Sequence, residues 1–505
     1  MNSSSGPKHT YTAPQLLRLL KTQKSDFWIA KGQEHTLDLF HRASVQVPAY
    51  KDFLKKHKIN STKIKTWEDF QYVPRIDKKN YLQKYKRELL CWNGNLSKPL
   101  VFTATSGSTG EPYYFPRSQT LDWQYSVIVE EYFQNSKRDP KDPVLVIIGF
   151  GMGLWIGGLI TYKAFEIAGQ RAKIPLSLLT PGINKTEIFN ALTKLAPSFK
   201  EVVLIGYPPF IKDVLDEATE HGINLKKLNI RLFFAAESFT ETFREYVAKK
   251  AGIKNLFWDT LNIYGSADIG AMAYETGIST FFKRIAINNK QLFKDLFTPI
   301  AKTPTLAQFN PLFTNFESVD GEILLSGDSE LPLIRYAIGD TGGVKSFNEV
   351  ASQVHTYVPD YEKQYIKQTG SRAFSKLPFV YIYERGDFAT KLYGATIFPE
   401  HVRDIMQDPA VERFVTGKFT MITKFDRQQN QYLEINVELR PHVNTSKILI
   451  TTLKKLIVQN FLEKNAEYKN NYLSMGKRVE PKLIFWPTEH PLFFKPGVKQ
   501  KWVRK

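Results

Sequence analysis

A stretch of ten residues, 103–112 (TATSGSTGEP), constrains this chain more than any other. Seven of the ten are Ser, Thr or Gly, and the flanking runs 99–102 and 113–115 are β-prone. Gly107 and Gly110 let the backbone turn sharply and approach a ligand closely. Consecutive backbone N–H groups in such a loop can form an anion-binding nest. The stretch lacks the Lys-Ser/Thr of a Walker A motif. It predicts a loop between two strands that wraps a polyphosphate; the alternative is a Ser/Gly hairpin loop without a ligand.

Size and composition are those of a globular protein. The chain has 505 residues, of which 42% are hydrophobic and 24% charged, enough for about two to four structural units. It has no run of ~18 apolar residues, which predicts no membrane span. The first residues, MNSSSGPKHTYTAP, lack the apolar core of a signal peptide. Cys91 is the only cysteine, which excludes an intramolecular disulfide and a multi-cysteine metal site. We therefore expect a cytoplasmic protein.

The chain is strongly basic, with a formal net charge of +19. Residues 441–505 hold 13 Lys and Arg against 4 Asp and Glu, a net charge of +9. Such an excess attracts anionic ligands such as nucleotides or coenzyme A, unless it is only a solvated lysine-rich surface. No zinc-finger spacing or RNA-binding motif accompanies it, so we expect no nucleic acid partner.

Hydrophobic patterning alternates between strand and helix through the middle of the chain. This alternation predicts a largely parallel sheet flanked by helices. The predicted strands are 143–150, 201–205, 230–235 and 262–264, and the predicted helices are 15–24, 77–90, 120–136, 210–221 and 241–250. Residues 322–326 and 344–346 look like strands of a more β-rich portion. Beyond residue 385 we expect a small α+β domain with strands 391–393, 419–424, 433–439 and 482–486 and helices 399–406 and 446–465.

Four short motifs follow one another along the chain, and their order and spacing carry information about the fold. They are TSGSTGEP (105–112), NIYGSAD (262–268), IGDTG (338–342) and ERGDFATKLYGATIFPEHV (384–402). In this order and spacing they resemble the motifs of the acyl-adenylate-forming superfamily. That superfamily includes acyl-CoA synthetases, peptide-synthetase adenylation domains and luciferases.

The chain resembles most closely the phenylacetate–CoA ligase branch of that superfamily. The segments that carry this likeness are VPAYKDFLKK (47–56), WEDFQYVPRIDKKN (67–80), AAESFTETFREYV (235–247), LPLIRYAIGD (331–340) and KQKWV (499–503). The resemblance covers nearly the whole chain. It implies an α/β fold: a large multi-sheet α/β domain, 1–384, and a smaller, mobile α+β domain, 385–505, with a hinge near Asp387.

The resemblance also implies a two-step reaction. A small carboxylic acid attacks the α-phosphate of ATP, giving acyl-AMP and pyrophosphate, and an acceptor such as coenzyme A then displaces AMP. Mg²⁺ assists the first step, because cations neutralise the growing phosphate charge. The site residues that the resemblance implies are Thr105, Ser106, Gly107, Ser108, Thr109 and Gly110 for pyrophosphate, Tyr264 and Gly265 with Ala236, Glu237 and Ser238 for the base, Asp340 and Arg385 for the ribose, Asp268 for the metal, Asp387 as the hinge, and Lys499 for the adenylation transition state.

Three positions depart from the family pattern. Glu111 stands where a lysine is common, and Ser266-Ala267-Asp268 replaces the usual x-Thr-Glu, so the shorter acid must reach the metal directly or through water. Trp502 stands where the family has an arginine. Lys495 and Lys501 lie close to Lys499, and either is an alternative for its role.

Several predicted site residues also have a purely structural interpretation. Tyr264 could be a core aromatic, Asp340 a turn aspartate, Asp268 the cap of a following helix and Lys499 a solvated lysine. Residues 149–158, 207–209 and 264–275 are expected to line the acid pocket. Phe150, Trp155 and Tyr207 there favour an aromatic or planar acid, unless they serve only for packing.

Three functions follow from these observations. The first is a carboxylate–CoA ligase, and the second is an adenylating enzyme that passes its acyl group to an amine or a carrier protein. The third is a weakened nucleotide-binding homologue, suggested by the changes at positions 111 and 267–268. It is opposed by the retained Asp340, Arg385 and Asp387 and by the candidate Lys499. Whether the chain forms a homodimer stays open.

Overall fold

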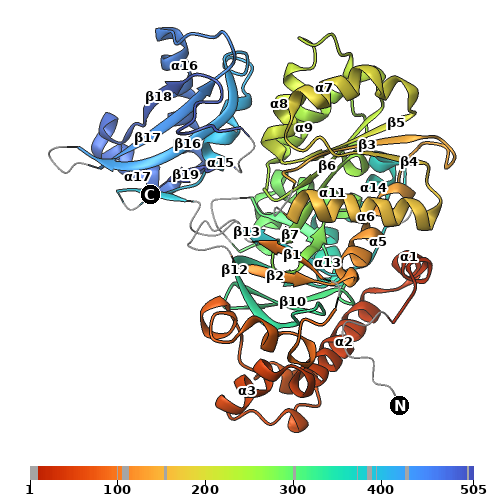
Figure 1. Cartoon of the computed structure of the whole chain (residues 1–505). Helices are drawn as coiled ribbons and strands as arrows, with labels where there is room; N and C mark the ends of the chain where they lie inside the picture. The colour runs from red at the N-terminus through yellow and green to blue at the C-terminus, as the bar shows by residue number, and fades with distance from the viewer. Residues whose placement is uncertain are drawn as a thin grey trace.

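The computed structural model describes residues 10–98, 100–104, 113–152, 156–298, 303–371, 374–383, 389–393, 395–426, 431–496 and 500–504. They form a large part built on one long sheet and a smaller C-terminal part, drawn in blue in Figure 1. The large sheet has eleven strands in the order β10-β11-β12-β13-β9-β8-β7-β6-β5-β3-β4.

One half of this sheet is parallel, as the strand–helix alternation predicts. Its strands are β3 (Val144–Gly149), β4 (Leu176–Leu179), β5 (Glu201–Gly206), β6 (Ile230–Ala235) and β7 (Thr260–Ser266). Both faces of this half are covered, and β3 shows how. Val146 packs into one hydrophobic core and its neighbour Ile147 into another on the opposite face. A strand buried on both faces reads as the continuous apolar run seen at residues 144–149.

Helices cover both faces of the parallel half of the sheet. On one face lie α1 (Ala13–Thr22), α5 (Gln119–Gln134) and α6 (Ile156–Ala172), and on the other lie α7 (Lys185–Lys194), α8 (Pro208–Glu217) and α9 (Glu241–Ala251). The short α10 (Leu256–Asp259) precedes β7.

The other half of the sheet is antiparallel, so the expectation of a largely parallel sheet holds only as far as β7. Its strands are β8 (Gly270–Tyr274), β9 (Thr305–Gln308), β10 (Thr314–Val319), β11 (Glu322–Gly327), β12 (Leu333–Lys345) and β13 (Phe379–Tyr383). Short turns join several of these strands, and a turn reverses the chain where a crossover helix would keep it parallel. The two strands expected at 322–326 and 344–346 are present and belong to the same sheet.

Two groups of helices pack on the antiparallel half. The N-terminal group is α2 (Ser25–Gln46), α3 (Pro48–Lys56) and α4 (Trp67–Phe70), and the other is α11 (Gly277–Asn288), α12 (Lys290–Leu296), α13 (Phe347–Tyr357) and α14 (Tyr361–Thr369). Pro48 begins α3, where its missing N–H costs nothing.

The helix predicted at 77–90 is wrong. The structure has one π-helical turn at Lys78–Leu82 and a separate 3-10 turn at Arg87–Leu90. Tyr81 and Leu90 are both buried in the core formed with the N-terminal helices, and this packing overrides local helix propensity. Asp77 does cap the first turn, because its carboxylate accepts the backbone N–H groups of Lys79 and Asn80.

The C-terminal part has its own core and its own sheet of four strands in the order β18-β17-β16-β19. The hairpin expected at 419–439 is confirmed and slightly longer. The elements are β14 (Thr390–Leu392), β15 (Ala395–Ile397), α15 (Glu400–Arg403), β16 (Val415–Phe425), β17 (Gln431–Leu439), α16 (Lys447–Lys464), α17 (Ala466–Met475), β18 (Lys482–Trp486) and β19 (Val503–Arg504). The α/β class with a smaller α+β part is therefore confirmed.

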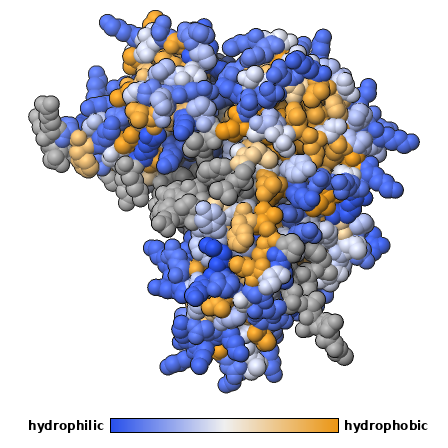
Figure 2. Space-filling view, in the orientation of Figure 1, coloured by the Kyte–Doolittle hydropathy of each residue, from blue (hydrophilic) through white to orange (hydrophobic). Residues whose placement is uncertain are grey.

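The surface agrees with the basic, charge-rich composition. The face shown in Figure 2 is mostly hydrophilic, with an apolar strip down the centre of the large part, below its junction with the small part. Among the helices of the described residues, none combines the length and apolar character needed to cross a bilayer.

Candidate active site

Two residues from separate sequence motifs meet in the structure. Tyr264 lies on β7 and Asp340 on β12, and the Tyr264 hydroxyl donates a 2.6 Å hydrogen bond to Asp340 Oδ2. Asp340 is buried and Tyr264 is half-buried. The structural interpretations, a core aromatic and an isolated turn aspartate, therefore do not describe them fully: the two form a buried polar pair.

The meeting of Tyr264 and Asp340 requires a curved sheet. Three strands, β8, β9 and β13, separate β7 from β12 in the hydrogen-bonding order. Four strand spacings span about 19 Å in a flat sheet, farther than a tyrosine and an aspartate side chain reach together. The antiparallel half must therefore curl towards the parallel half. The ring of Phe316 on β10, only 6.2 Å from that of Tyr264, agrees with this curl.

The predicted base-lining residues follow β6 directly. Ala236 has a φ of 74°, a left-handed conformation that is uncommon for a residue with a side chain. Glu237 is buried, and its backbone carbonyl accepts a 3.4 Å hydrogen bond from the Asn262 side chain on β7. Because parallel strands end at the same edge of a sheet, this segment lies next to the end of β7, where Tyr264 is.

Gly265 fixes the geometry between the two ends of the 262–268 motif. The pairing of β7 with β8 shifts register between Tyr264 and Gly265. A Cβ at position 265 would lie 2.6 Å from the carbonyl oxygen of Gly270, which is closer than real Cβ contacts. A larger residue would push the two strands apart and displace Tyr264.

Asp268 lies in the turn between β7 and β8 and is buried. Its Oδ2 accepts a 2.6 Å hydrogen bond from the Tyr336 hydroxyl, and the Lys78 ammonium lies 3.7 Å away. Asp268 does not cap a helix, because a strand follows it. Within the described ranges no three His, Cys, Asp or Glu side chains form a metal cage. A lone carboxylate still suits Mg²⁺, which usually keeps several waters and substrate phosphates as its other ligands.

Several predicted site residues lie outside the described residues. They are Thr105, Ser106, Gly107, Ser108, Thr109, Gly110, Arg385, Asp387 and Lys499, and also Glu111 and Trp155. Their neighbours in the chain are placed. The strands β1 (Val101–Ala104) and β2 (Tyr114–Arg117) pair antiparallel on either side of 105–112, as predicted. Tyr383 pairs with Thr341, the residue that follows Asp340.

The C-terminal tail contacts the base-lining segment. Trp502 is buried and its indole N–H donates a 3.1 Å hydrogen bond to Glu237 Oε2. The Arg403 guanidinium lies 4.5 Å from the centre of a Trp502 ring and donates to the Ser238 carbonyl at 2.8 Å. We call this arrangement of Trp502 and Arg403 on residues 237–238 the tail contact.

A second contact between the two parts is ionic. Lys212, Asp213 and Asp216 of α8 face Lys418 and Arg440 of the small part, a set here called the interface charge cluster. Lys418 lies 2.5 Å from Asp213, Arg440 lies 2.7 Å from Asp216, and Lys212 donates to the Thr416 carbonyl at 2.7 Å. Burial opposes ionisation of Asp216, but the charges of Lys212 and Arg440 outweigh it and lower the pKa of that carboxyl to about 2.

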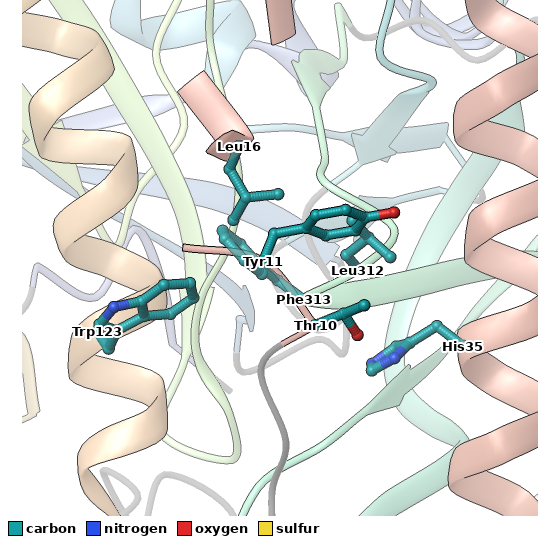
Figure 3. A pocket seen from close by; sticks show the side chains of 7 residues that line it. All are labelled: Thr10, Tyr11, Leu16, His35, Trp123, Leu312 and Phe313. Carbon is teal, nitrogen blue, oxygen red and sulfur yellow. The ribbon is translucent and has the colours of Figure 1, made fainter. Parts of the chain in front are cut away.

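The expected aromatic acid pocket is only partly placed. Phe150 is fully buried in the core that β3 shares with α5 and α6, and its ring meets that of Tyr207 edge-on at 4.9 Å. Packing therefore accounts for Phe150. Figure 3 shows a different, small hollow, lined by Thr10, Tyr11, Leu16, His35, Trp123, Leu312 and Phe313. It contains none of the predicted site residues.

Sequence reasoning missed three residues of this region: Lys78, Tyr336 and Trp502. Lys78 and Tyr336 lie within segments 67–80 and 331–340, which carry the branch resemblance, but no local signal indicated that both approach Asp268. The sequence marked Trp502 as a departure from the family pattern and predicted no role for it. Its partner Glu237 lies 265 positions away, so no local pattern could predict the pair.

The chain resembles known proteins in structure but not in sequence. No protein-family model matches the chain, and no curated protein sequence does. Among solved structures, it is similar to a 2-hydroxyisobutyryl-CoA ligase in the postadenylation state in complex with 2-HIB-AMP, with a TM-score of 0.65 at 13% identity, covering 96% of this chain and 91% of that one. The same ligase with 2-HIB-AMP and CoA in the thioesterification state gives a TM-score of 0.53 at 14% identity, with the same coverage.

These likenesses define the class of fold. The chain shares its fold with this CoA ligase, in agreement with the order of its motifs. The open conformation of that ligase, in complex with 2-HIB-AMP and CoA, gives a TM-score of 0.52 at 13% identity.

Proposed function

We propose that this protein is an AMP-forming acid–CoA ligase. A carboxylic acid attacks the α-phosphate of ATP, pyrophosphate leaves, and coenzyme A then takes the acyl group from acyl-AMP. The observation that carries the proposal is the hydrogen bond between Tyr264 and Asp340. It joins two motifs at the edge of the sheet where residues 236–238 and Asp268 also lie, in a fold shared with a ligase solved with an acyl-AMP.

The proposed roles follow the chemistry of each group. Asp340 and Arg385 bind the ribose, because a carboxylate accepts hydroxyl donors and a guanidinium adds donors beside it. Tyr264 stacks on adenine, with Ala236, Glu237 and Ser238 along the base. Residues 105–110 hold the pyrophosphate portion. Lys499 stabilises the charge that grows during adenylation and leaves when the small part rotates at Asp387.

Asp268 would hold Mg²⁺, whose bound form neutralises phosphate charge. Lys78, 3.7 Å from the same carboxylate, adds a positive charge on that side of the site. Tyr336 fixes the carboxylate by its hydrogen bond, so its orientation does not depend on the nucleotide.

Other observations support the choice of acid and acceptor. The likeness to the phenylacetate–CoA ligase branch and the ring of Tyr207 support an aromatic or planar acid. The CoA complexes of the similar ligase support coenzyme A as the acceptor. The cysteine-poor composition supports a cytoplasmic location.

The proposal is tested by pyrophosphate exchange. Purified protein with ATP, Mg²⁺ and labelled pyrophosphate should return label to ATP in the presence of some member of a panel of aromatic and aliphatic acids. Adding coenzyme A should then give a thioester, detected by mass spectrometry. Well-folded protein that supports no exchange with any acid would contradict the proposal; exchange without a thioester would redirect it to another acceptor.

A further inference from the structure

We propose that Trp502 is a positioning residue that docks the C-terminal tail onto the base-lining segment for the first half-reaction. The inference rests on the proposed function and adds a device that holds one conformation. Trp502 is only 4% exposed. Its ring packs on Phe419 of β16 at 4.9 Å, and its N–H reaches across to Glu237 on the large part.

An indole suits this position because it satisfies opposite charges at once. Its π-face attracts the Arg403 guanidinium, and its edge N–H donates to the Glu237 carboxylate. An arginine at 502, the residue common in the resembled family, would place a second cation against Arg403. Trp502 instead contacts both groups: its ring faces Arg403 of the small part, and its N–H donates to Glu237 of the large part.

The tail contact is anchored on both sides. On the small part, the buried Gln500 side chain donates to the Phe419 carbonyl at 2.9 Å, and β19 pairs in parallel with β16. On the large part, the Ser238 carbonyl next to Glu237 accepts a hydrogen bond from Arg403, which lies on α15 of the small part. Trp502 is therefore held against the same segment that lines the proposed base site.

The contact belongs to one arrangement of the two parts. The chain resembles the similar ligase most in its postadenylation state, with TM-scores of 0.65 against 0.53 and 0.52 for the other two states. Rotation of the small part for acyl transfer would separate Trp502 from Glu237. Trp502 should therefore promote adenylation and be dispensable for transfer from acyl-AMP.

The test separates the two half-reactions in Trp502→Phe, which keeps the ring but removes the N–H. Pyrophosphate exchange should slow about tenfold, the effect of losing one hydrogen bond to a charged group. Transfer from synthetic acyl-AMP to coenzyme A should stay within about twofold. Trp486→Phe is the matched control: that indole N–H donates to Asn436 within the small part at 2.7 Å, so neither half-reaction should change. Equal effects of Trp502→Phe on both half-reactions, or no effect on either, would overturn the inference.

A distance measurement tests whether Trp502 docks the small part onto the large part, independently of catalytic activity. Spin labels at Lys227→Cys on the large part and Gln459→Cys on the small part report the distance between them; both positions are exposed. The native Cys91 is buried, which raises its pKa to about 12 and keeps it unreactive. With Trp502 the labels should give one narrow distance distribution, and Trp502→Phe should broaden it towards longer distances. An unchanged distribution would refute docking by Trp502 even if the protein activates no acid.

Discussion

Asp340 shows how one residue gains a role from its contacts. It is buried, and the Tyr264 hydroxyl donates to it at 2.6 Å. A carboxylate oriented in this way is prepared to accept hydroxyl donors from a bound ribose without first losing conformational freedom. The sequence identified both residues, but as separate motifs; the structure makes them a pair.

Asp340→Ala should therefore impair ATP use far more than folding. Loss of hydrogen bonds to a charged group, worth ~1.5–3 kcal/mol each, should raise the apparent KM for ATP about ten- to a hundredfold. Thermal unfolding by circular dichroism should show only a modest loss, comparable to one buried hydrogen bond. The exposed Asp360→Ala should leave the KM for ATP unchanged. An unaltered KM for ATP in Asp340→Ala would remove this residue from the site.

At the scale of elements, the tail is a short strand, β19, on the edge of the small sheet. It is held there by two ladder partners, Met421 and Ile422, and by the side chain of Gln500. A two-residue strand is weak alone, so the burial of Trp502 must contribute much of its stability. Of the three tail lysines, Lys495 and Lys501 are exposed and described, whereas Lys499 lies outside the described residues.

Lys499→Ala should slow adenylation by on the order of 10²-fold, the range for losing one oriented group that stabilises a transition state. Because such a group acts on rate more than on binding, KM values should change little. Transfer from synthetic acyl-AMP should continue at nearly the native rate. Lys495→Ala and Lys501→Ala serve as matched controls; a defect in one of them instead of Lys499→Ala would show that the predicted alignment of the tail is shifted.

At the scale of the whole molecule, two parts with separate cores are joined through the tail contact and the interface charge cluster. Such interfaces between domains are polar and permit relative motion. The cluster is buried but consists of paired charges, so removing one partner should cost more than the pair itself contributes. Asp216 is the best probe, since it contacts Lys212 of its own helix and Arg440 of the small part.

Asp216→Asn should destabilise the folded protein by about 2 kcal/mol at pH 7. Because the folded pKa of Asp216 is lowered to about 2, its stabilising effect is complete above the unfolded pKa and is lost as pH falls towards 2. Urea unfolding at several pH values should show the difference between native protein and Asp216→Asn shrinking below about pH 4. A difference that does not depend on pH would contradict the assigned charge interactions.

The sequence by itself determined the local elements and the order of the motifs. Hydrophobic periodicity, which acts within a few residues, predicts the apolar run at 144–149, the strand at 230–235 and the hairpin around 419–439. The motif order also indicated the two-part fold, because each motif occupies a fixed place in it.

Only the tertiary structure decided which distant residues meet. The curl of the sheet brings Tyr264 to Asp340, Lys78 and Tyr336 converge on Asp268, and Trp502 reaches Glu237. The break in the expected helix at 77–90 has the same origin, since burial of Tyr81 and Leu90 outweighs local propensity. Contacts between residues tens to hundreds of positions apart depend on how whole elements pack, and packing free energy is a property of the assembled core.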